Sequence, residues 1–217
     1  EMGRAADRAC IQYRILNRGK GPAVWSLRAQ ADRREYQKVM KHTLELQENL
    51  WVKQAEVVEI LTEGGGVSGG VTHTGAGYRV KAAVVATGTY LGGRTIVGEV
   101  VRDSGPDGLA AALPLTRCLV DLGLSIRRFK TGTPPRVNAR SVDFSKLEVQ
   151  PGDEDAQPFS FSTREQPANR AVCWLTSTTP ETHAVIRANL DRSPLFSGVI
   201  EGVGPRYCPS IEDKVVR

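Results

Sequence analysis

The sequence has few of the features that mark secreted, membrane or metal-binding proteins. Its four cysteines are widely spread and form no C-x-x-C pair, which in a chain of 217 residues favours reduced thiols over a disulfide framework. Its three histidines share no ligand spacing with one another or with a cysteine, so no metal site is expected. No apolar run approaches the roughly 20 residues of a membrane helix, and no signal peptide leads the chain. We therefore expect a cytoplasmic protein without membrane association.

Positive charge is concentrated in two parts of the chain. Hydrophobic residues make up 40% and charged residues 24%, an ordinary globular composition, and the net charge is +5. The stretch from Arg14 to Lys41 contains eight cations and two acids, and the stretch from Ser125 to Arg140 contains five cations and no acid. Such clusters suit nucleic acid or a cofactor phosphate. The alternative is a solvated helix face with arginine stems packed along the surface.

The apolar pattern predicts a helix and then a small antiparallel sheet. Apolar residues at helical spacing favour an amphipathic helix over Leu27–Glu48. Short strands joined by glycine-rich turns should follow as a meander, at Leu50–Lys53, Val57–Leu61, Val67–His73 and Tyr78–Lys81.

A strand buried on both faces is predicted next. The run Lys81–Thr89 is apolar, β-branched and ends in Thr-Gly, as in a parallel sheet covered by helices. Ligands collect at the carboxyl ends of such strands, where Thr87 and Gly88 would lie. Helix, meander and buried strand in this order are typical of dinucleotide-binding flavoproteins, although many α/β domains have a strand that ends in glycine.

The second half of the chain begins with a stiff loop. A helix over Leu115–Leu122 and a strand over Ser125–Lys130 are expected to precede it. Two prolines make Lys130–Arg136 irregular, and its cations and hydroxyls suit anion or ring contacts, unless it is only a rigid connector. A change in composition places a domain boundary near Asn138.

Beyond the boundary, two elements are predicted. Ala171–Leu175 reads as a strand. Thr179 as N-cap, Pro180 in the first turn and Glu181 after it predict a helix that runs to about Asn189.

Several segments carry a resemblance to a known family. The longest runs from Gly198 to Lys214 and contains Gly-Pro-Arg-Tyr-Cys-Pro-Ser-Ile-Glu-Asp-Lys. Shorter ones follow the family's order: Arg14–Asn17, Lys20–Val24, Arg28–Arg33, Lys130–Arg136 and Val142–Ser145. The chain resembles the FAD-dependent large subunit of the tRNA uridine 5-carboxymethylaminomethyl modification enzyme, the glucose-inhibited division protein A family.

The resemblance implies an internal fragment of an enzyme about three times as long. Its fold class would be α/β: part of a Rossmann-like FAD-binding domain with an antiparallel β-meander, plus much of an inserted α/β domain. Residues 1–138 would be the partial FAD-binding domain and residues 139–217 the incomplete NADH-associated domain. The Rossmann-type Gly-x-Gly-x-x-Gly segment with which the family begins is absent, so the fragment alone is expected to be inactive.

The resemblance also implies two cofactor sites and a catalytic thiol. Val57 and Ala112 match flavin contacts of the family, although Ala112 has no hydroxyl to donate. We add Thr87, Gly88, Lys130, Thr131 and Gly132 as flavin-side candidates. Cys208 matches a cysteine needed for activity, as nucleophile or acid/base, with Arg206 favouring its thiolate; the alternative is a small buried apolar residue. The NADH segment comprises Gly204, Pro205, Arg206, Tyr207, Cys208, Pro209, Ser210, Ile211, Glu212, Asp213, Lys214, Val215, Val216 and Arg217.

By resemblance, the parent enzyme installs a carboxymethylaminomethyl or aminomethyl group at carbon 5 of the wobble uridine of tRNA. It would use FAD, NADH and methylenetetrahydrofolate, form a homodimer and join a GTPase partner in a heterotetramer. Arg28, Arg33 and Arg34 are candidates for tRNA contact, or simply a solvated helix face. Two other hypotheses stay open: a generic FAD/NAD(P)H oxidoreductase without an RNA substrate, and a non-catalytic RNA-binding fragment.

Overall fold

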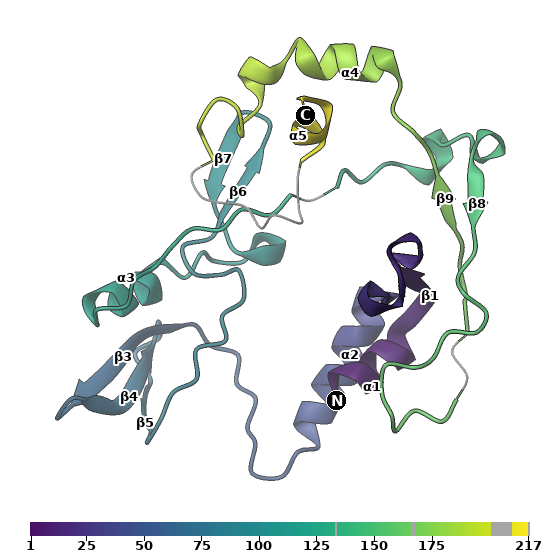
Figure 1. Cartoon of the computed structure of the whole chain (residues 1–217). Coiled ribbons are helices and arrows are strands. Elements are labelled where there is room, and N and C mark those ends of the chain that lie inside the picture. Colours follow the sequence, from purple (N-terminus) through teal and green to yellow (C-terminus); the bar gives the residue numbers. More distant parts are fainter. Residues whose placement is uncertain (133, 166–167, 201–209, 217) are drawn as a thin grey trace. The chain divides into compact units, whose positions relative to one another are not determined.

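The computed structural model describes residues 1–132, 134–165, 168–200 and 210–216. The chain divides into two compact units, each built from two segments. Unit 1 comprises residues 1–53 and 137–177, and unit 2 comprises residues 54–136 and 178–217 (Figure 1). The chain passes from unit 2 back to unit 1 between Arg136 and Val137, next to the predicted boundary near Asn138. The division by cofactor, into 1–138 and 139–217, stays a prediction.

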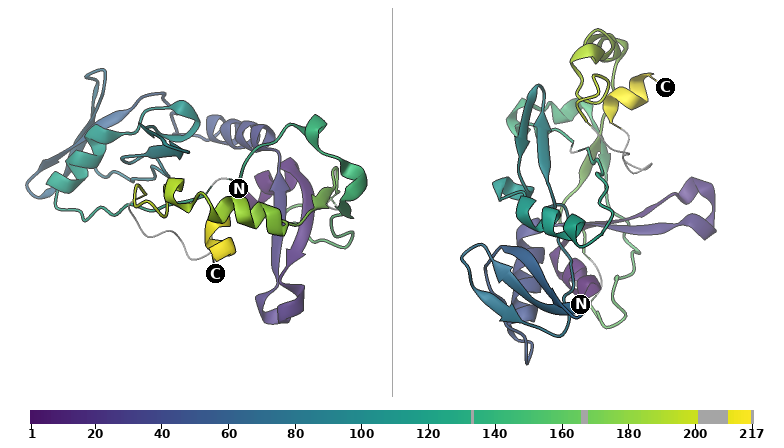
Figure 2. Two further views of the ribbon diagram at one scale, coloured as in Figure 1. Left: turned by 90° about the horizontal axis from the view of Figure 1, so that it is seen from above. Right: turned by 90° about the vertical axis from the view of Figure 1, so that its left-hand side faces the viewer.

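Unit 1 is built on a two-stranded hairpin and two helices. Helix α1 (Met2–Ala9) leads directly into β1 (Cys10–Leu16), which pairs antiparallel with β2 (Ser26–Ala31). Helix α2 (Arg33–Glu45) follows β2, and a second hairpin joins β8 (Glu148–Gln150) to β9 (Cys173–Leu175). Figure 2 shows the loop end of the first hairpin extending away from α1 and α2.

The predicted helix over Leu27–Glu48 is wrong in its first part. Residues 26–31 form β2, because pairing with β1 outweighs their helical spacing. Asp32 then fixes the start of α2, since its carboxylate accepts hydrogen bonds from the backbone N–H groups of Arg34 (2.8 Å) and Glu35 (3.1 Å).

A half-buried carboxylate ties the two segments of unit 1 together. Asp7 accepts hydrogen bonds from the Tyr13 hydroxyl (2.9 Å), the Thr163 hydroxyl (2.6 Å) and the backbone N–H groups of Phe159 (2.8 Å) and Ser160 (3.0 Å). Burial raises the pKa of Asp7, but these hydrogen bonds outweigh it and hold the pKa below its ordinary value. Tyr13 itself packs with Cys10 and Ala156 in the core of this unit.

Unit 2 contains the predicted meander, of which the last three strands are confirmed. Strands β3 (Val57–Glu63), β4 (Gly66–Thr72) and β5 (Gly77–Arg79) pair antiparallel in that order. Gly64 and Gly65 turn the chain between β3 and β4 with φ of +58° and +82°, a region that glycine enters without steric cost. Gly64, Gly66 and Gly69 have Gly-x-Gly-x-x-Gly spacing, but they lie in the β3–β4 hairpin rather than between a strand and a helix. They are therefore not the Rossmann-type segment with which the family begins.

The described residues of unit 2 also form a further hairpin and three α-helices. Strands β6 (Arg94–Val97) and β7 (Val100–Asp103) pair antiparallel, and no sequence signal led us to expect them. The helices are α3 (Leu113–Asp121), α4 (Pro180–Arg187) and α5 (Ile211–Val216). The predicted N-cap of α4 is confirmed, since the side chains of Thr179 and Thr182 form a capping box; the helix ends at Arg187 rather than near Asn189.

Three predicted strands are wrong. Residues 50–53, 82–86 and 125–130 form no strand, and Val84 is 91% exposed. A strand of a parallel sheet needs neighbours on both sides, and among the residues the structure describes none pairs with this run. The four sheets that the described residues form are all antiparallel, so the fold is mixed α/β with small sheets. None of the described helices is long and apolar enough to cross a membrane.

Candidate cofactor-binding site

The predicted cofactor residues that the structure describes all belong to unit 2. Thr87 and Gly88 form a turn in which the backbone N–H of Tyr90 donates to the Thr87 carbonyl (3.1 Å). Gly88 has a φ of +56° and open space where a Cβ would stand, so a ligand can approach its backbone closely. This turn leads into a second one, in which Gly93 donates to the carbonyl of Tyr90 (3.1 Å).

The loop of residues 87–93 is held against the start of α3. The backbone N–H of Gly93 donates to the carbonyl of Ala111 (3.3 Å), one residue before Ala112. Ala112 is the N-cap of α3, has a left-handed conformation (φ 45°, ψ 43°) and supplies no side-chain cap. The structure thus brings Thr87, Gly88 and Ala112 to one end of α3, where backbone N–H groups favour negative charge.

Two cations of the acid-free run Ser125–Arg140, here called the basic loop, make contacts within unit 2. The Arg128 guanidinium donates to the carbonyl of Gly92 (2.9 Å), within the loop of residues 87–93. Two residues later, the Lys130 ammonium lies 3.7 Å from the carboxylate of Asp213 in α5. The side chains of this pair are 11% and 23% exposed, so the ion pair is largely shielded from water. Lys130, a flavin-side candidate, therefore contacts Asp213, which belongs to the predicted NADH segment.

Asp213 also fixes the start of α5. Its carboxylate accepts hydrogen bonds from the backbone N–H (3.1 Å) and the hydroxyl (3.3 Å) of Ser210, and the Ser210 hydroxyl accepts from the Asp213 N–H (3.2 Å). At the other end, Arg187 of α4 donates to the carbonyl of Val215 (3.1 Å). The described part of the NADH segment is therefore a short helix clamped at both ends.

The other acidic residue of α5, Glu212, has a pKa below its ordinary value. Burial by itself raises the pKa of Glu212. Hydrogen bonds from its own backbone N–H, from Ser210 and from the Ser193 hydroxyl (3.2 Å) outweigh burial, so the pKa falls below its ordinary value. The Glu212 carboxylate, in the first turn of α5, thus suits the positive end of the helix.

Val57, the first of the flavin-side candidates in the chain, lies at the start of β3 in the same unit. It pairs with Thr72 of β4 and is 42% exposed. Strand β3 contacts α3 through Cys118, whose sulfur accepts a hydrogen bond from the backbone N–H of Ile60 (3.3 Å). Thr131 and Gly132, which follow Lys130 in the chain, are exposed.

Seven residues of the predicted NADH segment lie outside the described residues: Gly204, Pro205, Arg206, Tyr207, Cys208, Pro209 and Arg217. The predicted catalytic role of the Cys208 thiol therefore stays a prediction.

The three arginines proposed for tRNA do not share one site. Arg33 and Arg34 lie in the first turn of α2, and Arg34 lines a groove between α1 and α2 together with Arg8 and Lys41. Arg28 lies on β2 and lines a different groove of unit 1.

Sequence reasoning missed the brace formed by Arg128 and the contact between Lys130 and Asp213. The absence of acids between Ser125 and Arg140 indicates that the cations of this stretch matter, but it does not predict which residues they contact. No group of three or more histidine, cysteine or acidic residues that could hold a metal ion occurs within the part of the chain that the structure describes.

Comparison with known proteins gives matches over the whole chain. The model of the family described as "Glucose inhibited division protein A" matches residues 1–217. The tRNA uridine 5-carboxymethylaminomethyl modification enzyme MnmG of Caldicellulosiruptor saccharolyticus is 59% identical over 217 residues, and that of Bacillus subtilis is 54% identical; the chain covers 35% of each. It therefore spans about a third of the length of these relatives.

Solved structures give the same result. GidA of Aquifex aeolicus in its form I crystal matches with a TM-score of 0.88 at 46% identity, covering 100% of this chain and 37% of that one. The form II crystal gives a TM-score of 0.85 at 43% identity. These matches confirm the predicted fold class.

Proposed function

The chain belongs to the glucose-inhibited division protein A family, and from this we propose that it is a segment of an FAD- and NADH-dependent enzyme that modifies the wobble uridine of tRNA. The observation that carries the proposal is identity of 52–59% to relatives named for tRNA uridine modification, across all 217 residues. A shared fold alone would be weaker support, because many functions are built on one fold.

The flavin would lie against the N-terminal end of α3 in unit 2. Bound FAD supplies electron transfer between NADH and the one-carbon unit. Two features fit such a ligand: the open backbone at Gly88, and the start of α3, which carries no side-chain cap of its own. Arg128 would keep the loop of residues 87–93 in place through its hydrogen bond to Gly92. Val57, Thr131 and Gly132 are proposed as further contacts of the same cofactor.

The NADH segment would be positioned by the Lys130–Asp213 ion pair. The pair fixes α5 against the basic loop, and residues 204–217 would then present their backbone and Arg206 to the dinucleotide. Lys130 is thus a positioning residue: its ammonium is occupied by Asp213 and would act by orienting the segment.

Cys208 is proposed as the catalytic residue. It would act as nucleophile or acid/base at the uridine or at the methylene adduct. For the nucleophilic role its sulfur must be a thiolate, which Arg206 would stabilise. The finer details are also proposals: methylenetetrahydrofolate as one-carbon donor, glycine or ammonium as amine source, carbon 5 as the site of modification, a GTPase partner, a homodimer and a cytoplasmic location.

A grafted enzyme tests this function. In it, the 217-residue chain replaces the matched third of the Bacillus subtilis relative. We expect a yellow protein that oxidises NADH and modifies wobble-uridine tRNA, detected by mass spectrometry of digested tRNA. The 217-residue chain alone should be colourless and inactive. NADH oxidation without tRNA modification would support the generic oxidoreductase, and RNA binding without either activity would support the non-catalytic fragment.

A further inference from the structure

One groove of unit 1 is lined by cations that no proposed cofactor contact uses. This hairpin groove lies beside β1 and β2 and includes Arg14, Asn17, Arg18, Arg28, Gln150 and Asp153. Every one of these residues belongs to unit 1, so the groove is formed without any contribution from unit 2.

Two of the arginines face each other across the hairpin. Arg14 of β1 and Arg28 of β2 are direct partners in the antiparallel register, so their side chains leave the same face of the sheet. Directly opposite residues have Cβ atoms about 4.5–5.5 Å apart, and like charges in such a pair repel. An anion placed between them would remove this repulsion.

The charges of the groove are only partly compensated. Arg18 pairs with the carboxylate of Asp153 (3.1 Å), the acid of the groove. The Arg14 guanidinium donates to the neutral side-chain oxygen of Gln150 (2.7 Å), which orients it but leaves its charge in place. Within residues 1–132, 134–165, 168–200 and 210–216, the Arg28 side chain makes no hydrogen bond or ion pair. Arg14 and Arg28 therefore have no acidic partner among the described residues.

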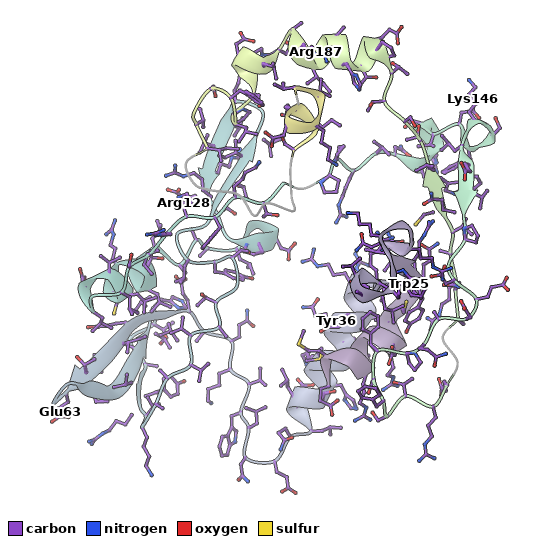
Figure 3. The ribbon with its side chains drawn as sticks, viewed as in Figure 1. Trp25, Tyr36, Glu63, Arg128, Lys146 and Arg187 are labelled. Atoms are coloured by element: carbon purple, nitrogen blue, oxygen red, sulfur yellow. The ribbon has the colours of Figure 1, made fainter. Side chains whose placement is uncertain are left out.

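An aromatic ring lies on the loop that closes the hairpin. Trp25 is 50% exposed, and its indole N–H donates to the carbonyl of Arg18 (3.2 Å), a residue of the groove (Figure 3). The Asn17 amide closes the same loop by donating to the carbonyl of Val24 (3.2 Å). The ring is thus held against the backbone of Arg18, at one end of the groove's hairpin, with half of the residue's surface open. Cations next to a fixed, exposed ring are the elements that bind unpaired nucleotides.

We propose that the hairpin groove binds a phosphodiester group of a single-stranded RNA segment between Arg14 and Arg28, with a neighbouring base stacked on Trp25. This inference rests on the proposed function, in which tRNA is the substrate, and assigns the contact to unit 1. A dinucleotide cofactor offers phosphate as well, but the proposed cofactor contacts that the structure describes lie in unit 2.

Binding of a fluorescein-labelled anticodon stem-loop RNA to the 217-residue chain, measured by fluorescence anisotropy over a series of salt concentrations, tests the proposal. Arg28→Gln should weaken binding about fivefold and make the dependence of log K on log salt shallower by about 0.7, the value for one single-strand phosphate contact. Trp25→Leu should weaken binding about tenfold with little change in that slope. The control is Arg117→Gln, which removes an exposed cation of α3 and should change affinity less than twofold.

Four results would overturn the proposal: no binding by the unaltered chain, Arg28→Gln with unchanged affinity and slope, displacement of the RNA by NADH or FAD, or equal competition by polyglutamate. A duplex RNA bound as tightly as the stem-loop would remove the single-stranded assignment. Thermal unfolding checks the variants, and Arg28→Gln should leave the melting temperature unchanged or raise it, because the repulsion with Arg14 disappears. If the grafted enzyme modifies tRNA while Arg28→Gln binds normally, only this inference fails; if it does not modify tRNA, the proposed function fails.

Discussion

Exchanging Lys130 for methionine tests whether the flavin-side loop and the NADH segment are energetically coupled. The Lys130–Asp213 distance is 3.7 Å and the two side chains are 11% and 23% exposed. Exposed ion pairs contribute about 0–1 kcal/mol, and breaking a fully buried pair costs about 3–5 kcal/mol. This pair lies between those limits, so Lys130→Met should lower the free energy of unfolding by about 2 kcal/mol. Methionine keeps most of the apolar stem, which confines the change to the charge.

Asp213→Asn completes a double-mutant cycle with the same ion pair. Asparagine can still accept the hydrogen bonds from Ser210, so the start of α5 should remain capped. We expect a coupling energy of about 1–2 kcal/mol from urea unfolding, and faster amide exchange over residues 211–216 in each single variant. The matched control is Lys146→Met, because its ion pair with Asp143 (3.3 Å) is 80% and 55% exposed. A coupling energy below about 0.3 kcal/mol would refute the argument.

Two further predictions concern stability. Asp7→Asn should lower the free energy of unfolding by about 2 kcal/mol at neutral pH, because hydrogen bonds to a charged acceptor are lost. The pKa of Asp7 is lowered in the folded chain, so the contribution of the carboxylate to stability is present above the unfolded value near 3.8 and is lost as pH falls through the folded value. Urea unfolding should therefore show the stabilities of the variant and the unaltered chain converging in acid. Ala112→Gly should stabilise the chain by about 0.5–1 kcal/mol, because alanine at φ 45° is strained and glycine is not, and calorimetry that showed a loss of stability would contradict this.

Local signals in the sequence were sufficient for the meander and for α4. Glycines at Gly64 and Gly65 mark a turn that a side chain would strain, and Thr179-Pro180 marks a helix start by its own chemistry. Neither depends on distant residues. The resemblance of the 198–214 segment, with the matches over residues 1–217, gave the family.

Features that depend on distant partners could not be predicted in this way. Residues 26–31 have helical spacing, yet they are a strand because β1 lies beside them. The apolar run around Val84 reads as a buried strand, but burial requires neighbouring strands, and none pairs with it among the described residues. The contact between Lys130 and Asp213 joins segments far apart in the sequence, and no local pattern at either residue encodes it.

Replacing Cys208 by serine in the grafted enzyme tests the central claim most directly. Serine keeps the size of the side chain but not the thiolate, so modified uridine should disappear while the protein stays yellow, oxidises NADH and binds the anticodon stem-loop as before. Unchanged modification by the serine variant would contradict the account, because the thiol would then have no chemical part in the reaction.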